Sequence, residues 1–296
     1  MILDRLEKQQ AIHPPSWMNS NTVYLTYMGS VAYGVSSDTS DADIYGFCIP
    51  PKDFIFPHLR GEILDFGRQK KRFGQWQEHH VKDPSDPKKV WDFQIFSIVK
   101  YFHLCMDCNP NMIDSLFTPR VSVIHSTQIA EMVREQRHLF LHKGAWHRFK
   151  GYAYSQLHKM NSKDPTGKRK ELREKFGFDV KYAYHLVRLL DECEQILQFG
   201  DIDLQKNKEH LKAIRRGEVS EEEVRQWAAD KEAQLEKLYH ESKIPDTPDE
   251  PRIKALLEEC LEHHYGTMGE ALVNPDAASL ALQDIEEIIR KVRGKL

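Results

Sequence analysis

The sequence predicts an α+β protein, with a small mixed β-sheet and flanking helices first and a helical C-terminal part after them. Two observations lead to this fold class. Runs of β-branched and aromatic residues, which are typical of buried strands, are confined to about the first 120 residues. From about Val123 onward, apolar residues recur every three or four positions, which is typical of helices. A length of 296 residues suits one large domain or two ordinary ones.

Four strands are expected in the first part, one for each short run rich in β-branched or aromatic side chains: Thr22–Met28, Ala42–Ile49, Gly61–Phe66 and Trp91–Ile98. The fourth run leads directly into an apolar helix at Val99–Cys105. The stretch Arg68–Lys89 is polar and contains Asp-Pro twice, so we expect an exposed loop or hairpin there.

The second part is predicted to be a series of helices, and the main ones are Gln128–His142, Ala145–Met160, Asp179–Phe199 and Asp249–His264. A charged connector is expected at Asn161–Lys175. Ser220 and Glu223 have the spacing of a capping box, which predicts another helix start. We therefore expect a sheet-containing domain at 1–120, a helical domain at 121–265 that completes a cleft, and a tail at 266–296 with a terminal helix near 278–292.

The composition argues against several classes of protein. With 42 basic and 45 acidic residues, the net charge of −3 gives no overall attraction to nucleic acid. No apolar stretch approaches the roughly 20 residues of a membrane span, and the charged N-terminus is unlike a secretion signal. The five cysteines are too scattered for a disulfide framework, and Cys105 and Cys108 are expected to be packing thiols. A cytoplasmic protein is the simplest expectation.

One segment combines the features of a phosphate site and a metal site. The first strand ends at Gly29, which permits a tight turn, and Ser30 is placed to cap a short helix with outward-facing amides. About ten residues later, Asp41 and Asp43 stand two positions apart at the start of the next strand, so their carboxylates share one face. Paired carboxylates suit Mg²⁺, which also bridges substrate phosphates. Together, these features predict phosphoryl or nucleotidyl transfer.

The run GSVAYGVSSDTSDADIYG, residues 29–46, resembles the signature of the polymerase-β-type nucleotidyltransferase superfamily. It is most similar to the predicted bacterial and phage branch, which includes members associated with RNA ligases. Three later stretches also resemble that branch, so that the likeness covers about 20–200: Asp92–Leu116, Phe149–Leu157 and Lys181–Leu190.

The resemblance implies a role for each residue of the first motif. Gly29 and Ser30 would hold the β- and γ-phosphates of a nucleoside triphosphate, and Tyr33 and Ser40 would bind the same substrate. Asp41 and Asp43 would be catalytic metal ligands. These assignments make the domain at 1–120 the catalytic one.

The superfamily has a third carboxylate on a later strand, and Asp92 in WDFQIF is the matching position. A strand would place Asp92 and Gln94 on one face. Burying a charged Asp among aromatic neighbours is costly unless its carboxylate faces a cleft and binds a metal. The alternative is a solvated Asp at a strand start. Glu78, Asp83 and Asp86 are rivals in the polar stretch, without a strand context.

Three basic residues on the helix Asp179–Phe199 form a polar stripe at i, i+4 and i+7: Lys181, His185 and Arg188. A basic, solvated helix face is the simpler interpretation. The resemblance implies that this helix face is instead a wall of the cleft and neutralises the charge of the triphosphate. Lys181 or Arg188 would then contact a phosphate, and His185 would hydrogen-bond a phosphate or orient a carboxylate.

The predicted function is therefore a nucleotidyltransferase that uses two Mg²⁺ ions, with Mn²⁺ as a substitute, and transfers a nucleoside monophosphate from a triphosphate. ATP is the default donor, and the acceptor is a hydroxyl on an RNA end or a protein side chain. No membrane partner is expected. Three alternatives stay open: a nucleotide- or RNA-binding pseudoenzyme, a metal-dependent phosphohydrolase, and a toxin–antitoxin partner that modifies a protein.

Overall fold

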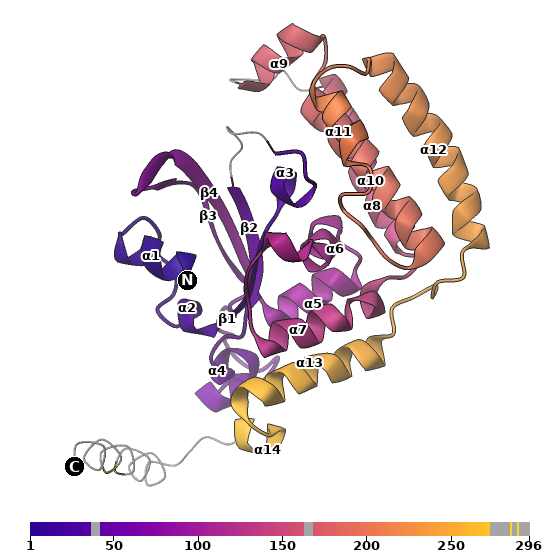
Figure 1. The fold of residues 1–296 in the computed structure, drawn as a ribbon. Coiled ribbons are helices and arrows are strands. Elements are labelled where there is room, and N and C mark those ends of the chain that lie inside the picture. Colours follow the sequence, from indigo (N-terminus) through magenta and orange to yellow (C-terminus); the bar gives the residue numbers. More distant parts are fainter. Residues whose placement is uncertain (37–41, 163–167, 273–284, 286–288, 290–296) are drawn as a thin grey trace.

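The computed structural model describes residues 1–36, 42–162 and 168–272, together with residues 285 and 289. The described chain has a mixed five-stranded sheet with helices on both of its faces, and a group of longer helices beside it (Figure 1). The α+β fold class is confirmed. The expected terminal helix near 278–292 falls almost entirely outside the described residues.

The sheet has the strand order β3-β4-β2-β1-β5, in which β2 and β4 are parallel and the other neighbours are antiparallel. Its strands are β1 (Thr22–Tyr27), β2 (Ala42–Cys48), β3 (Gln75–Asp83), β4 (Asp86–Ser97) and β5 (Val123–Ser126). The first two expected strands are confirmed to within a residue. The fourth is confirmed but begins at Asp86, because it is half of a hairpin with β3. That hairpin occupies much of the polar stretch where a loop or hairpin was expected.

The expected strand at Gly61–Phe66 is wrong. It follows a short helix, and Gly61 adopts a left-handed conformation with a φ of 75°. An isolated bridge between Ile63 and Phe66 folds the segment on itself, and Phe66 is 75% exposed. The run therefore has apolar residues of the right kind without a partner strand to bury them.

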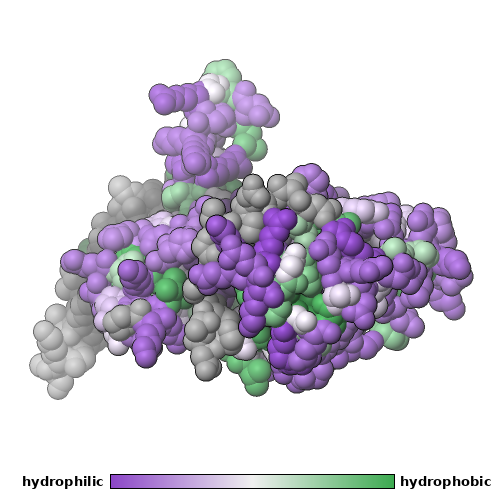
Figure 2. Space-filling view, turned by 90° about the horizontal axis from the view of Figure 1, so that it is seen from above, coloured by the Kyte–Doolittle hydropathy of each residue, from purple (hydrophilic) through white to green (hydrophobic). Residues whose placement is uncertain are grey.

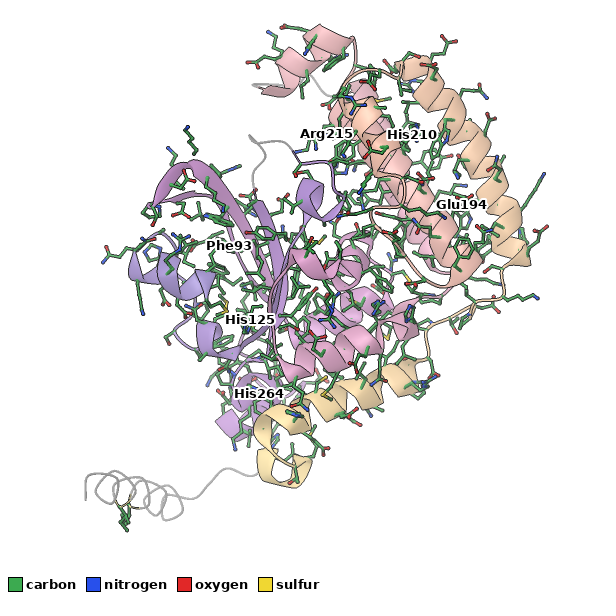
Figure 3. The ribbon with its side chains drawn as sticks, in the orientation of Figure 1. Phe93, His125, Glu194, His210, Arg215 and His264 are labelled. Atoms are coloured by element: carbon green, nitrogen blue, oxygen red, sulfur yellow. The ribbon has the colours of Figure 1, made fainter. Side chains whose placement is uncertain are left out.

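Each face of the sheet packs on a different set of helices. Because successive strand residues alternate, Ile44 and Phe93 lie on the face covered by the N-terminal helices, where they join Leu3 and Leu6 in one core (Figure 3). That face is covered by α1 (Ile2–Lys8) and α2 (Met18–Asn21). The opposite face packs on α5 (Ile98–Met106), α6 (Pro110–Phe117) and α7 (Gln128–Glu135). Asp43 and Asp92, one position from Ile44 and Phe93, therefore point toward this second layer.

The longer helices form the helical part: α8 (Ala145–Ser162), α9 (Lys168–Phe176), α10 (Val180–Phe199), α11 (Lys208–Arg215) and α12 (Glu221–Glu241). Asp179 caps α10, and the predicted capping box of Ser220 and Glu223 begins α12. Half of the expected connector is helical, because Lys, Arg and Glu in α9 are good helix formers. The shorter elements are α3 (Gly29–Ala32), α4 (Lys52–Ile55), η1 (Pro57–Arg60), η2 (Arg120–Ser122), η3 (Arg137–Phe140) and α14 (Met268–Ala271).

The sheet extends beyond residue 120, where the first domain was expected to end. β5 pairs with β1, and α13 (Glu250–Tyr265) returns from the helical part to pack beside α5 and α7. The Tyr265 hydroxyl donates to the carbonyl of Pro50, which fixes the end of α13 near the end of β2. Two later segments thus pack with the sheet-containing part of the fold.

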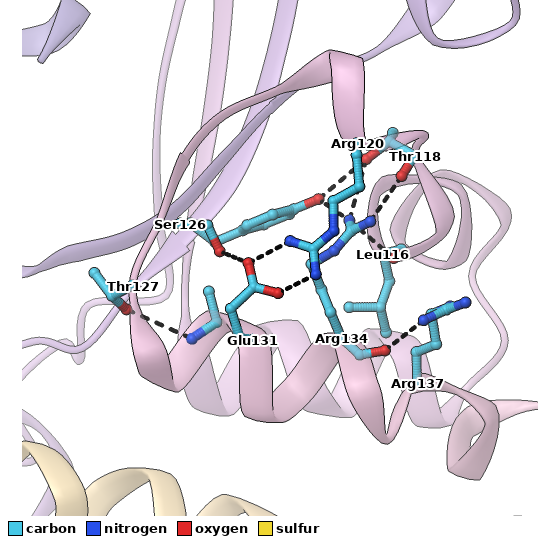
Figure 4. A network of polar contacts seen from close by, with 10 residues as sticks. Leu116, Thr118, Arg120, Ser126, Thr127, Glu131, Arg134 and Arg137 are labelled. Carbon is cyan, nitrogen blue, oxygen red and sulfur yellow. Dashed lines mark hydrogen bonds and ion pairs between the residues drawn. The ribbon is translucent and has the colours of Figure 1, made fainter.

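Arg134 of α7 joins the sheet to the turn after α6 (Figure 4). Its guanidinium donates to the Tyr24 hydroxyl, to the Leu116 carbonyl at 3.2 Å and to the Thr118 carbonyl at 2.8 Å. Next to it, Glu131 pairs with Arg120. Arg134 is buried, and the oxygens that it contacts are neutral hydroxyls and carbonyls. Its guanidinium therefore acts as a donor of several hydrogen bonds, which together set the position of α6 on the sheet.

The surface seen from the top of the first view is mainly hydrophilic, and hydrophobic residues occupy only small areas of it (Figure 2). Within the described residues, no helix combines the length and the apolar character that a bilayer crossing requires. Cys105 and Cys108 are buried, and burial raises the pKa of Cys108 to about 12, in agreement with packing thiols.

Asp83 ties the first helix to the β3–β4 hairpin. Its carboxylate accepts hydrogen bonds from Arg5 at 2.8 and 2.7 Å and from the Trp91 indole at 3.1 Å. Arg5 holds the pKa of this carboxyl well below its usual range. Asp83 therefore has a structural role.

Replacing Asp83 by Asn is expected to lower the free energy of unfolding by about 1–3 kcal/mol, because charge-assisted hydrogen bonds to Arg5 are lost. Since the pKa of Asp83 is lowered by folding, its contribution is present above about pH 4 and is lost as the pH falls below that value. Urea unfolding at pH 7 and pH 3 measures both effects. A difference between wild type and variant that is as large at pH 3 as at pH 7 would contradict this role.

Candidate active site

Asp43 and Asp92 are direct neighbours on the sheet. In the parallel pair β2–β4, the register places Asp43 opposite Asp92, and adjacent strands lie about 4.7–4.9 Å apart. Both side chains are partly buried, and that of Asp92 is 20% exposed. The pairing of β2 with β4 thus brings together two carboxylates that are 49 positions apart in the sequence.

The turn at Gly29 lies directly against Asp43. The backbone amide of Met28 donates to the Asp43 carbonyl at 2.8 Å, and Gly29 follows with a φ of 60°. A Cβ on Gly29 would lie 2.3 Å from Oδ2 of Asp43. Only a glycine gives the backbone this close approach to the carboxylate.

Ser30 does not cap α3, contrary to expectation. Met28 occupies the N-cap position, and Ser30 is the second residue of the helix. The left-handed Gly29 is the first residue of the helix, so α3 begins two residues earlier than it would with Ser30 as its cap. Ser30 is half-buried, and its carbonyl accepts a hydrogen bond from the backbone amide of Val35 at 2.9 Å.

Asp92 also supports an irregularity in β3. Its Oδ1 accepts a hydrogen bond from the backbone amide of His80 at 2.6 Å, where the register slips and His80 adopts a φ of 57°. The Nδ1 atoms of His79 and His80 lie 3.7 and 3.9 Å from the same oxygen. Adjacent residues of a regular strand point to opposite faces, so two neighbouring histidines would not both approach one carboxylate. The bulge removes that restriction.

Asp41 and Ser40 lie outside the described residues, so their predicted roles stay predictions. Asp43 and Asp92 fit a Mg²⁺ site, because they supply hard oxygen ligands side by side and the glycine beside them has no side chain to intrude. Within the described ranges, no three His, Cys, Asp or Glu residues gather as a metal site by themselves. Asp41 is the expected third ligand.

Tyr33 and Arg188 lie in the protein interior. They bond to other buried side chains there and are not exposed as the predicted contacts to the triphosphate require. The Tyr33 hydroxyl donates to Oδ2 of Asp114 at 2.8 Å, and the Arg188 guanidinium lies 4.2 Å from the centre of the Tyr33 ring. Arg188 pairs with Asp114 and, at 2.8 Å, with Glu192, and all four side chains are nearly inaccessible to solvent. The expected stripe fails because α10 turns Arg188 inward, where two carboxylates compensate its charge.

Burial raises the pKa of both Asp114 and Glu192, with Arg188 opposing the shift. The two acids face one guanidinium, so the network is neutral when one proton is shared between them. A carboxyl whose pKa is raised by folding holds its proton more tightly in the folded chain than in the unfolded one. The folded chain therefore binds more protons, and its stability falls as the pH rises.

Glu192→Gln is expected to flatten this dependence, because the amide keeps an acceptor for Arg188 without needing a proton. The free energy of unfolding of the wild type should fall relative to the variant between pH 5 and pH 8, by up to about 1.4 kcal/mol per pH unit. Urea titrations across that range measure it, with the exposed Glu222→Gln as control. Parallel pH profiles for wild type and Glu192→Gln would contradict a shared proton.

Lys181 and His185 lie in the first turns of α10. Lys181 is exposed, whereas His185 is half-buried with its ring 4.2 Å from that of Tyr184. Arg215 lies over the Tyr184 ring and donates to the Val35 carbonyl, so this end of α10 is near Val35 (Figure 3). The predicted roles of Lys181 and His185 toward the triphosphate stay predictions.

Tyr45 is a further residue of the site, which sequence reasoning missed. It follows Asp43 on the same face of β2, and burial, assisted by the charge of Asp43, raises its pKa above the usual value. Tyr152 of α8 is also near it and lines a cavity of about 520 Å³ between the α5–α6 turn and α8. The i+2 spacing from Asp43 is a signal that could have identified Tyr45.

Residues 1–265 match the family described as RlaP, RNA repair pathway DNA polymerase beta family. The chain belongs to this family. No curated protein matches the chain. Among solved structures, a nucleotidyltransferase-like protein from Exiguobacterium sibiricum 255-15 is similar, with 11% identity and a TM-score of 0.29 over 97% of this chain and 90% of that one. The family match confirms the predicted resemblance, and membership of the RlaP family supports a nucleotidyltransferase role.

Proposed function

We propose that the chain is a Mg²⁺-dependent nucleotidyltransferase that moves a nucleoside monophosphate from a nucleoside triphosphate, with ATP as the default donor, to a hydroxyl at an RNA end. The observation that carries this proposal is the alignment of Asp43 with Asp92 beside the turn at Gly29. Phosphoryl-group transfer uses paired carboxylates to hold metal ions, and it uses backbone amides that can approach the phosphates closely. The family description, which refers to RNA repair, favours an RNA acceptor over a protein side chain.

Mg²⁺ would be held by Asp43 and Asp92, with Asp41 as the expected third ligand. When bound, it supplies charge neutralisation for the triphosphate and acidity for the acceptor hydroxyl.

The residues of the chain position the reactants. The backbone at Gly29 and Ser30 would hold the β- and γ-phosphates, and Tyr45 would form a wall of the site. The acceptor oxygen forms a bond with the α-phosphorus, the bond from that phosphorus to the pyrophosphate oxygen breaks, and the hydroxyl proton goes to solvent. Positioning and charge complementarity supply most of the rate in such a reaction.

Product mass after incubation with each α-labelled triphosphate and a single-stranded RNA tests the proposal. We expect the RNA to gain the mass of a nucleoside monophosphate, with one preferred triphosphate and only with Mg²⁺. An RNA with both terminal hydroxyls blocked is the matched control and should gain none. Free nucleoside monophosphate would indicate a phosphohydrolase, and an adduct on protein would indicate a protein-modifying enzyme. Triphosphate binding without any product would indicate a pseudoenzyme.

A further inference from the structure

The turn that approaches Asp43 is too short to hold its own position. Residues 29–35, here called the glycine turn, contain the four-residue helix α3 and three backbone hydrogen bonds of 2.9–3.2 Å within the segment. A single helical turn is unstable by itself, because its formation fixes several residues for very few hydrogen bonds. Contacts from elsewhere must therefore determine where the glycine turn lies.

Those contacts come from α6 and from the helical part. The side-chain amide of Gln205, before α11, donates to the Ala32 carbonyl at 3.0 Å, and Arg215 of α11 donates to the Val35 carbonyl. Asp114 of α6 accepts the hydroxyl of Tyr33. The three anchors are thus spread along the second half of the glycine turn, while Gly29 at its other end faces Asp43.

Arg188 connects the strongest of these anchors to α10. It stacks on the ring of Tyr33 and pairs with Asp114, so one guanidinium fixes both members of the Tyr33–Asp114 hydrogen bond. All three groups are buried, where water cannot replace a lost partner. A shift of α10 relative to the sheet would therefore move Tyr33 and, with it, the glycine turn.

We propose that Asp114 and Arg188 are positioning residues of the transfer reaction, which hold the glycine turn at the separation from Asp43 that the triphosphate requires. This inference rests on the proposed function. The two residues touch no substrate and act through Tyr33. Because a displacement of about 1 Å in an active site can cost about 100-fold in rate, loosening the anchor lowers kcat even when the chain stays folded.

Steady-state kinetics of the full chain, with its preferred triphosphate and RNA, test the inference. Asp114→Asn keeps an acceptor for Tyr33 but loses the charge that orients Arg188, and we expect kcat to fall about 10- to 100-fold with the KM for RNA unchanged. Tyr33→Phe removes a single hydroxyl and should lower kcat by about 3- to 10-fold. If Asp114→Asn does not fold, Tyr33→Phe decides the question.

Asp83→Asn is the matched control, because Asp83 is also a buried carboxylate paired with an arginine but lies by the other face of the sheet. It should lower the melting temperature and leave kcat unchanged. An Asp114→Asn or Tyr33→Phe protein that melts earlier but keeps the wild-type kcat would show a purely structural role and overturn the inference. A wild type without transfer would overturn the proposed function itself, and the inference with it.

Discussion

Replacing either Asp43 or Asp92 by Asn is expected to lower nucleotide transfer by about 10³-fold or more, with little loss of stability. The two carboxylates meet in the parallel register of β2 and β4. In the proposed function, each would contribute a negative charge to the same Mg²⁺ site. Removing one such preorganised electrostatic group typically costs about 10²–10³ in kcat, and a shared ligand costs at least as much. Transfer measured under Mg²⁺ with the preferred triphosphate gives the ratio.

The Asn variants separate charge from structure. In Asp92→Asn the amide oxygen still accepts the bond from the His80 backbone, so the bulge in β3 is preserved. Asp86→Asn is the control, because Asp86 is an exposed carboxylate at the start of the same strand. An active Asp92→Asn enzyme would show that Asp92 only stabilises the bulge in β3. An active Asp43→Asn enzyme would contradict the assignment of the active site.

Gly29→Ala is expected to lower transfer by about 100-fold while the chain still folds. A Cβ at this position would lie 2.3 Å from Oδ2 of Asp43, so the turn or the carboxylate must move. The φ of 60° adds a backbone cost of about 1–2 kcal/mol. In the proposed function the backbone at Gly29 holds phosphate and Asp43 holds the metal, so a displacement of one from the other acts on the geometry of the reaction itself.

Gly67→Ala is the matched control that measures the cost of the left-handed backbone conformation alone. Gly67 has a φ of 68°, and no atom lies within 4 Å of a Cβ built there. It should share the small loss of stability with Gly29→Ala but keep full activity. Melting temperature and transfer rate, measured for both variants, distinguish strain from contact. Equal activity in the two variants would mean that the glycine turn does not need its close approach to Asp43.

The parts of the site that lie close together in sequence were predictable. A strand, a Gly-Ser turn and a carboxylate on the next strand follow from residue type and from the period of two. β1 and β2 appear where expected, whereas α3 begins before Ser30. Asp92 was predicted from its strand context and from the family resemblance. The register that places it beside Asp43 is a property of the assembled sheet.

Long-range partners could not be predicted. The spacing on α10 grouped Arg188 with Lys181 and His185, but Lys181 is exposed and Arg188 is buried, because periodicity does not tell which positions a neighbouring element covers. That depends on Asp114, 74 residues earlier in the chain, which provides a buried charge for Arg188. The strand expected at Gly61–Phe66 failed for a similar reason, since a run of apolar residues becomes a strand only where a neighbouring edge can accept its hydrogen bonds.

The bulge at His79 and His80 has a consequence for how the chain behaves in a crowded solution. β3 is an outer strand of an open sheet, and a regular outer strand offers a row of free amides and carbonyls to any other molecule. The slip in register interrupts that row, and polar side chains such as Gln77 and Lys82 flank it. The irregularity that Asp92 stabilises therefore also discourages edge-to-edge aggregation, and smoothing it would be expected to make the protein less soluble.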